Sequence, residues 1–104
     1  MSGVLLTQPV SEKKIAKAVA ALEKRFAPDV VRIRYSLMND WSGDPAIYFR
    51  LLMTDDAARH GEVARRWRQV IHGEVDPLNN WGLIPYTRYR SVSEQDELRD
   101  PAWN

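Results

Sequence analysis

Hydrophobic residues near the start of the chain recur at helical spacing and predict a helix over residues 12–26. The intervals of four, three and four residues put these side chains on one stripe of the helix surface; they are Ile15, Val19, Leu22 and Phe26. Ser11 directly precedes the helix and is a favourable N-cap, because its hydroxyl can accept from an unpaired backbone N–H. Pro28 cannot continue a helix and is expected to end this one.

Two later segments alternate apolar and polar residues, which is typical of strands with one buried face. The first covers residues 30–37 and would turn four side chains inward: Val31, Ile33, Tyr35 and Leu37. The second covers residues 46–53 and would turn inward Ile47, Phe49, Leu51 and Met53. The eight residues between the segments, 38–45, are rich in residues that form turns. We therefore expect an antiparallel hairpin.

A second helix is predicted to begin at Thr54 or Asp55, either of which can cap it. Its expected apolar face consists of Val63, Ala64, Trp67, Val70 and Ile71. Gly73 suits the position just beyond a helix C-terminus, because glycine readily takes the left-handed conformation that is common there. Residues 74–82 would then form a loop.

The remaining chain predicts a third strand and a short terminal helix. Pro85 favours an edge position for the strand of residues 83–90, because proline donates no hydrogen bond to a neighbouring strand. Ser91 and Glu94 have the spacing of a capping box, followed by one or two helical turns that end before Pro101. The order α-β-β-α-β predicts a two-layer α+β sandwich with a small three-stranded sheet. The sequence leaves open whether the third strand pairs with the first or the second.

Composition adds limits to this fold. A length of 104 residues with 44% hydrophobic content fits one domain that covers residues 1–104. The chain has no cysteine, which excludes disulfides, thiolate metal sites and cysteine nucleophiles. The first apolar run is too short for a secretory signal, and no stretch approaches the ~20 apolar residues that span a bilayer. We therefore expect a cytoplasmic protein without membrane contact.

The outward positions of the three strands carry basic and aromatic residues. With the apolar residues inside, the outward set is Arg32, Arg34, Tyr48, Arg50, Arg88 and Arg90. Such a face is similar in outline to sheets that bind RNA through stacking and phosphate contacts. The formal net charge of +1 gives no overall attraction to nucleic acid. We favour a solvated surface that nearby acidic residues neutralise: Glu94, Asp96, Glu97 and Asp100.

Three of the four tryptophans lie outside the predicted helices and strands. Trp41 falls in the hairpin loop, Trp81 in the loop before the third strand, and Trp103 in the C-terminal tail. Exposed tryptophans often anchor protein interfaces, because they bury a large area and carry an N–H donor. The alternative is that the loops close over the ends of the sheet and bury these rings within the molecule.

No set of residues has the spacing of a catalytic or cofactor site, and we expect no cofactor and no metal. Asp40 and Asp44 fit turn positions, and Asp55 is a helix-start residue. His60 and His72 lie twelve residues apart, about 120° out of register on a helix, and cannot share a metal ion. No phosphate-binding loop and no nucleophile elbow is present in the sequence.

The hairpin segment DWSGDPAIYFR, residues 40–50, resembles a segment of a family of short, uncharacterised bacterial proteins. This resemblance implies a bacterial cytosolic protein. It brings no activity, cofactor or site residue to this chain.

Three hypotheses follow from these residues. The favoured one is a small non-enzymatic module that binds a partner protein, or a second copy of itself, through Trp41, Trp81 and Tyr48. The alternative is a nucleic-acid-binding module that uses the basic residues Arg32, Arg34, Arg50, Arg88 and Arg90. A third is an enzyme with a pocket between the loop of residues 40–44 and the loop around Trp81. The open edges of a three-stranded sheet also allow homodimerisation by strand pairing.

Overall fold

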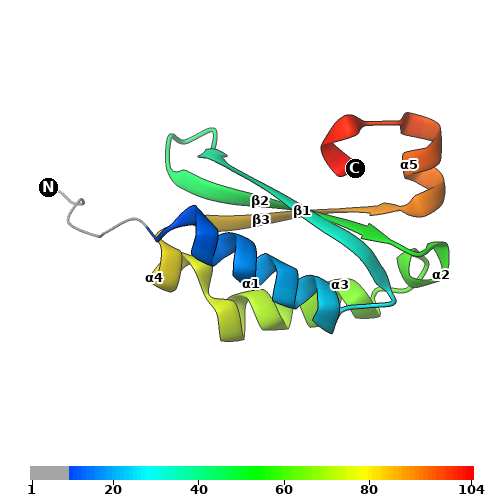
Figure 1. The fold of residues 1–104 in the computed structure, drawn as a ribbon, viewed down its shortest axis with the longest axis horizontal. Coiled ribbons are helices and arrows are strands. Elements are labelled where there is room, and N and C mark those ends of the chain that lie inside the picture. The colour runs from blue at the N-terminus through cyan, green and yellow to red at the C-terminus, as the bar shows by residue number, and fades with distance from the viewer. Residues whose placement is uncertain (1–9) are drawn as a thin grey trace, which may run out of the picture.

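The computed structural model describes residues 10–104 as a three-stranded sheet with helices on one face and the C-terminal segment on the other (Figure 1). The strands are β1 (Val30–Asn39), β2 (Pro45–Met53) and β3 (Ile84–Ser91), in the order β1-β2-β3. β1 and β2 form the predicted antiparallel hairpin, while β3 pairs with β2 in parallel. The predicted α+β fold class is confirmed. Residues 1–9, where the sequence predicts no secretory segment, lie outside the described residues.

The first helix, α1 (Glu12–Arg25), packs on the sheet through the predicted apolar stripe. The hydroxyl of Ser11 accepts from the backbone N–H of Lys14 at 3.2 Å, which confirms the predicted N-cap. Glu12 in the first turn and Arg25 in the last complement the helix dipole. Ile15, Val19, Leu22 and Phe26 are all buried. The helix therefore forms for the reasons that its sequence indicates.

β1 contains a bulge near its start, which changes the residues that face the helices. The pairing with β2 shifts between Val30 and Arg32, so that Val30 and Ile33 are both buried. Val31 is 47% exposed, and the prediction that it points inward is wrong. An extra residue in one strand reverses the alternation on one side of the bulge, and simple period-two counting does not detect it.

The connection from β2 to β3 is a crossover of several short helices, as a parallel strand pair requires. Thr54 caps α2 (Asp55–Ala58), and its hydroxyl accepts from the N–H of Ala57 at 3.1 Å. The chain then turns before α3 (Glu62–Val70), which begins after Gly61. The single helix expected from the sequence is thus divided, and α3 lies on the same side of the sheet as α1 (Figure 1).

The predictions for Gly73 and for a loop at residues 74–82 are also wrong. A π-helix, η1 (Ile71–Val75), continues from α3 through Gly73 and ends at Asp76. Asp76 takes a left-handed conformation with φ 48°, which aspartate tolerates better than most residues, and caps α4 (Pro77–Trp81). Proline at the first helical position lacks an N–H that would be unpaired there. The pair Asp76-Pro77 therefore sets the helix boundary.

The hydrophobic core lies between the sheet and the helices, with Trp67 of α3 at its centre. The indole packs edge-on against Phe26 and Phe49, at ring-centroid distances of 5.4 and 5.2 Å. Its Nε1–H donates to the hydroxyl of Thr87 on β3 at 2.9 Å. The buried indole therefore has its polar atom paired, and it joins α1, β2 and β3.

The C-terminal segment leaves β3, forms a helix and returns over the face of the sheet that the other helices do not cover (Figure 1). The predicted capping box is present in α5 (Val92–Leu98), where Ser91 and Glu94 exchange hydrogen bonds of 3.1 and 3.0 Å. Arg99 then takes a left-handed conformation with φ 51°, and a single 3-10 turn follows, η2 (Pro101–Trp103). This fold-back is the feature that shapes the candidate site.

Candidate functional site

The face of the sheet opposite α1 and α3, called the outer face below, is arranged in four rows that run across the strands. Strand register places on each row one residue from β1, one from β2 and one from β3. From the hairpin end, the rows are Met38–Ala46–Ile84, Ser36–Tyr48–Tyr86, Arg34–Arg50–Arg88 and Arg32–Leu52–Arg90. An apolar row and an aromatic row are thus followed by two rows that carry arginine.

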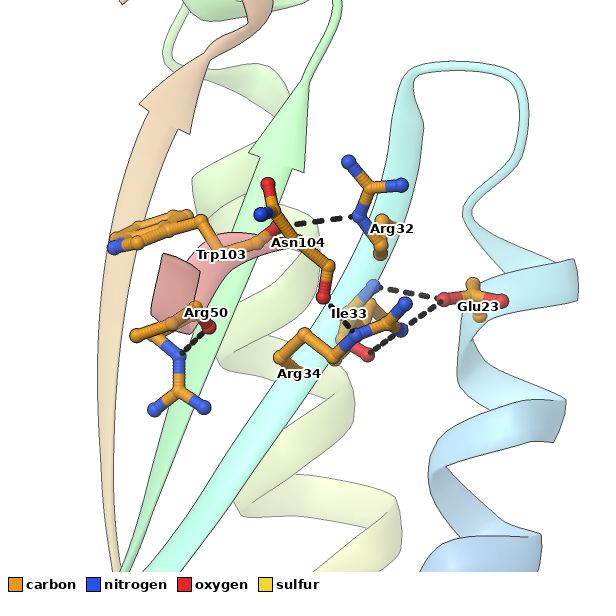
Figure 2. Close-up of polar contacts among 8 residues, drawn as sticks. Glu23, Arg32, Ile33, Arg34, Arg50, Trp103 and Asn104 are labelled. Atoms are coloured by element: carbon orange, nitrogen blue, oxygen red, sulfur yellow. Dashed lines mark hydrogen bonds and ion pairs between the residues drawn. The ribbon is translucent and has the colours of Figure 1, made fainter. Parts of the chain in front are cut away.

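The C-terminal residues 100–104, called the tail below, lie on the arginine rows and accept hydrogen bonds from them (Figure 2). The Nε–H of Arg50 donates to the carbonyl of Ala102 at 2.7 Å. Arg32 donates in the same way to the carbonyl of Trp103 at 3.2 Å, and Arg34 donates to the main-chain oxygen of Asn104 at 2.6 Å. Main-chain oxygens of three consecutive residues therefore each accept from one arginine of the sheet.

Further contacts anchor the tail to the sheet. The ring of Trp103 is buried, at 4% exposure, beneath the guanidinium of Arg90, whose Cζ lies 4.3 Å from the ring centroid. The side-chain amide of Gln95 donates to the carbonyl of Asp100 at 2.7 Å, and its oxygen accepts from Arg90 at 2.9 Å. Trp103 is therefore packed within the molecule and is not available to a partner.

Fewer acidic residues pair with the arginines of the outer face than the sequence predicts. Within the described residues, Asp100 pairs with Arg90 at 3.8 Å, and Glu23 of α1 pairs with Arg34 at 3.8 Å. On α5, Glu94 caps the helix. Within residues 10–104, no acidic residue of α5 forms an ion pair with an arginine of the outer face. Carbonyl oxygens take the place of carboxylates on Arg32 and Arg50, and a neutral acceptor leaves the positive charge uncompensated.

At the hairpin end, an aromatic cluster is fixed around Asp40. Tyr48 and Tyr86 stack with a centroid distance of 4.9 Å and an interplanar angle of 16°, and Trp41 meets Tyr86 edge-on at 5.9 Å. The hydroxyl of Tyr86 donates to Asp40 Oδ2 at 2.8 Å. The other oxygen, Oδ1, accepts from the N–H groups of Ser42 and Asp44, at 2.9 and 3.0 Å. Asp40 therefore links the hairpin turn to β3.

These contacts shift the pKa values of both partners. Burial raises the pKa of Asp40, but hydrogen bonds from Tyr86 and from backbone N–H groups of the turn outweigh it and hold the pKa below its ordinary value. The same hydrogen bond, helped by burial and by the charge of Asp40, raises the pKa of Tyr86 to about 12. Asp40 is thus a charged structural anchor whose oxygens are occupied.

The predicted interface tryptophans separate in the structure. Trp41 is 83% exposed on the hairpin, and Met38, in the outer-face row nearest the hairpin turn, is 56% exposed. Trp81 ends α4 on the helix-covered side of the sheet, where it is half-buried against the core (Figure 1). Tyr48 lies with Trp41 at the outer face and Trp81 does not. We call Met38, Trp41, Tyr48 and Tyr86 the hairpin-end patch.

A groove of about 350 Å³ runs between the hairpin-end patch and the tail. Its sheet side is formed by Ser36, Met38, Tyr48, Arg50 and Arg88, and its tail side by Asp100, Ala102 and Trp103. Arg50 is half-buried there and also donates through Nη1 to the hydroxyl of Ser36 at 2.9 Å. The side chain of Arg88 is exposed and makes no hydrogen bond or ion pair among residues 10–104.

The described part of the chain contains no cluster of three or more His, Cys, Asp or Glu residues placed to hold a metal ion. Across residues 10–104, every helix is too short or too polar to span a bilayer. Neither Asp40 nor Asp44 lines the groove, so the structure does not bring these carboxylates to the cavity that Arg50 and Arg88 line.

Comparisons of the chain with protein-family models, with curated proteins and with solved structures found no match.

Two features of this site were not foreseen from the sequence. The first is the tail on the arginine rows, for which the sequence signal is Asp100-Pro101 before Trp103, a capped turn that ends in a large apolar ring. The second is Tyr86, which lies in the segment predicted as the third strand and for which the sequence predicts no role. Its signal is its spacing of two from Arg88, which puts it on the same face.

Proposed function

We propose that the protein is a non-enzymatic interaction module that binds a partner protein through the hairpin-end patch. The observation that carries this proposal is Trp41, an indole that is 83% exposed yet held next to an ordered aromatic pair. A cytoplasmic location and a bacterial origin belong to the same proposal.

Exposure of the apolar side chains of this patch to water is unfavourable in free energy, and this supports the proposal. Large exposed apolar side chains that lie together, rather than scattered singly, mark interaction sites on soluble proteins. Tryptophan and tyrosine dominate the energetics of interfaces because they bury much area with little loss of side-chain freedom. Stacking and the Asp40 hydrogen bond already restrain Tyr86, so binding there has less side-chain entropy to lose.

The contacts of the outer face favour a protein over a nucleic acid. Tyr48 and Tyr86 stack on each other, so each ring has one face less to offer to a base. Arg32, Arg34 and Arg50 are bound to the tail, which leaves few arginines for the several phosphate contacts that nucleic-acid binding needs. Self-association through the same patch is the homotypic form of this proposal.

The test is photo-crosslinking in cells that produce the protein, with p-benzoylphenylalanine in place of Trp41. The matched control carries the same residue in place of Leu78, an apolar side chain on α4 that is 55% exposed and lies off the outer face. We expect a protein adduct from position 41 that survives nuclease and is missing from position 78. Equal adducts from both positions, or a nuclease-sensitive adduct, would contradict the proposal.

A further inference from the structure

We infer that the groove beside the tail receives an acidic side chain of the partner, whose carboxylate is held between Arg50 and Arg88. This inference deepens the proposed function and rests on it, because the acidic group belongs to the same partner that covers the hairpin-end patch. The groove adjoins that patch through Tyr48 and Met38, which line it.

The first support is the row of three arginines. Arg34, Arg50 and Arg88 face the same way at the same register, on strands about 5 Å apart. Like charges directly opposite each other destabilise a sheet, so this row carries an electrostatic penalty that an anion would relieve. Partial burial lowers the pKa of Arg50, Asp100 opposes this shift, and the charge of Arg34 adds to it.

The second support is the number of N–H donors left over. A guanidinium has five N–H donors. Arg50 directs Nε to the tail and Nη1 to Ser36, and its guanidinium points away from Trp103 and Asn104 (Figure 2). Arg88 has no partner among residues 10–104 and lines the same groove. Two neighbouring arginines with unused donors suit a carboxylate, which accepts from both at once.

The third support is the shape and chemistry of the groove. About 350 Å³ accommodates a few side chains and not a nucleic-acid backbone in extended contact. Met38, Tyr48 and Trp103 give apolar walls, which suit the methylene groups of a glutamate and an apolar neighbour. Asp100 on the tail side is already engaged, by Arg90 and by the N–H of Ala102. The site therefore fits an acidic segment that also carries an apolar or aromatic residue.

The test is an NMR titration of the full chain with acetyl-Glu-Glu-Phe-Glu-Glu-amide as the probe, followed through arginine Nε–H and backbone amide signals. The charge-reversed peptide acetyl-Lys-Lys-Phe-Lys-Lys-amide and a short oligothymidine are the comparison ligands. We expect the acidic peptide to shift the signals of Arg50, Arg88, Ser36 and Tyr48. Arg88→Gln should weaken this binding roughly fivefold, as loss of a partly exposed ion pair does.

The matched control is Arg68→Gln, which removes an exposed arginine from α3 on the opposite side of the sheet and should leave the affinity unchanged. Equal binding of the basic peptide, tighter binding of oligothymidine at these signals, or no shift at Arg50 and Arg88 would overturn the inference. The position-41 crosslink separates the two proposals. If this crosslink forms while the acidic peptide fails to bind the unchanged protein, the partner surface stands and its acidic contact is wrong.

Discussion

Asp40 shows how a single carboxylate can be structural although its surroundings look like those of a functional site. It accepts from two turn N–H groups and from Tyr86, and it fixes both the hairpin and the aromatic cluster. The turn explains one set of bonds, since aspartate commonly accepts from the backbone two residues later. The bond to Tyr86 spans 46 residues of sequence and depends on the parallel pairing of β3 with β2. Local sequence therefore predicts the hydrogen bonds that Asp40 accepts within the turn, but not the one that it accepts from Tyr86.

The tyrosine of this pair should respond strongly to loss of the carboxylate. Asp40→Asn removes the charge and the strong acceptor that keep Tyr86 protonated, so the pKa of Tyr86 should fall from about 12 toward the ordinary value of about 10. NMR titration of the tyrosine ring carbons measures this shift. Tyr89 is the internal control, because burial raises its pKa and Asp40 does not contribute. An unchanged Tyr86 titration in the variant would show that the hydrogen bond is absent in solution.

The same pair links stability to pH in two directions. Because the folded pKa of Asp40 is lowered, its contribution is present above the unfolded value, about 4, and is lost as the pH falls through the folded value. The folded pKa of Tyr86 is raised, so its contribution is complete below about 10 and is lost as the pH rises through about 12. Both contributions are therefore fully present at neutral pH.

Among the elements, α5 determines where the tail begins, and its N-terminus is fixed twice. The capping box of Ser91 and Glu94 satisfies the first N–H groups, and Asp55 of α2 accepts from both the backbone N–H and the hydroxyl of Ser93. The carboxylate of Asp55 thus ties α5 to α2. Gln95 on the next part of the helix binds the tail, so helix start and tail position are coupled.

Removal of the cap should therefore destabilise the protein. Ser91→Ala leaves the N–H of Glu94 without its acceptor, and we expect a loss of about 1 kcal/mol in the free energy of unfolding. Urea unfolding followed by circular dichroism measures it. Ser42→Ala is the control, because Ser42 lies exposed in the hairpin turn and only its backbone N–H is bonded to Asp40. A loss of the same size in both variants would argue against a specific cap.

The helices and strands with regular patterns were predictable, and the irregular joints between them were not. Ser11, Thr54 and Ser91 all act as the caps that the sequence indicates, because capping depends on a few adjacent residues. The bulge at Val31 and the π-helix through Gly73 depend instead on packing against the rest of the fold. Alternative local conformations differ in free energy by only a few tenths of a kcal/mol per residue, so tertiary contacts can override local preference.

At the scale of the whole molecule, the return of the tail over the outer face determines which arginines stay accessible (Figure 1). The alternation of β1, β2 and β3 places five arginines on one face, and this was predictable from period-two spacing. Which of them stay available was not, because hydrogen bonds from Arg32 and Arg34 to the tail join residues about 70 positions apart in the chain. The net charge of +1 gives no information on this covering.

Release of the tail should convert the covered face into a polyanion-binding surface. Trp103 is the main apolar anchor of the tail, so Trp103→Ala removes buried ring area and the contact with Arg90. Arg32, Arg34 and Arg50 would then lose their main-chain oxygen acceptors and could each neutralise a phosphate. We expect the variant to bind a single-stranded oligonucleotide with a log–log salt slope of roughly −2, as three phosphate contacts give, and the unchanged protein to bind it much more weakly.

Fluorescence anisotropy at several salt concentrations measures this difference, after circular dichroism has shown that the variant is folded. Trp41→Ala is the control, because it removes an exposed indole that does not hold the tail and should leave the weak binding unchanged. Adding Arg34→Gln to Trp103→Ala should reduce the steepness of the salt dependence by the share of one phosphate contact. If Trp103→Ala binds no better than the unchanged protein, the tail does not control access to these arginines. The outer face would then be a surface for the acidic partner alone, with or without the tail in place.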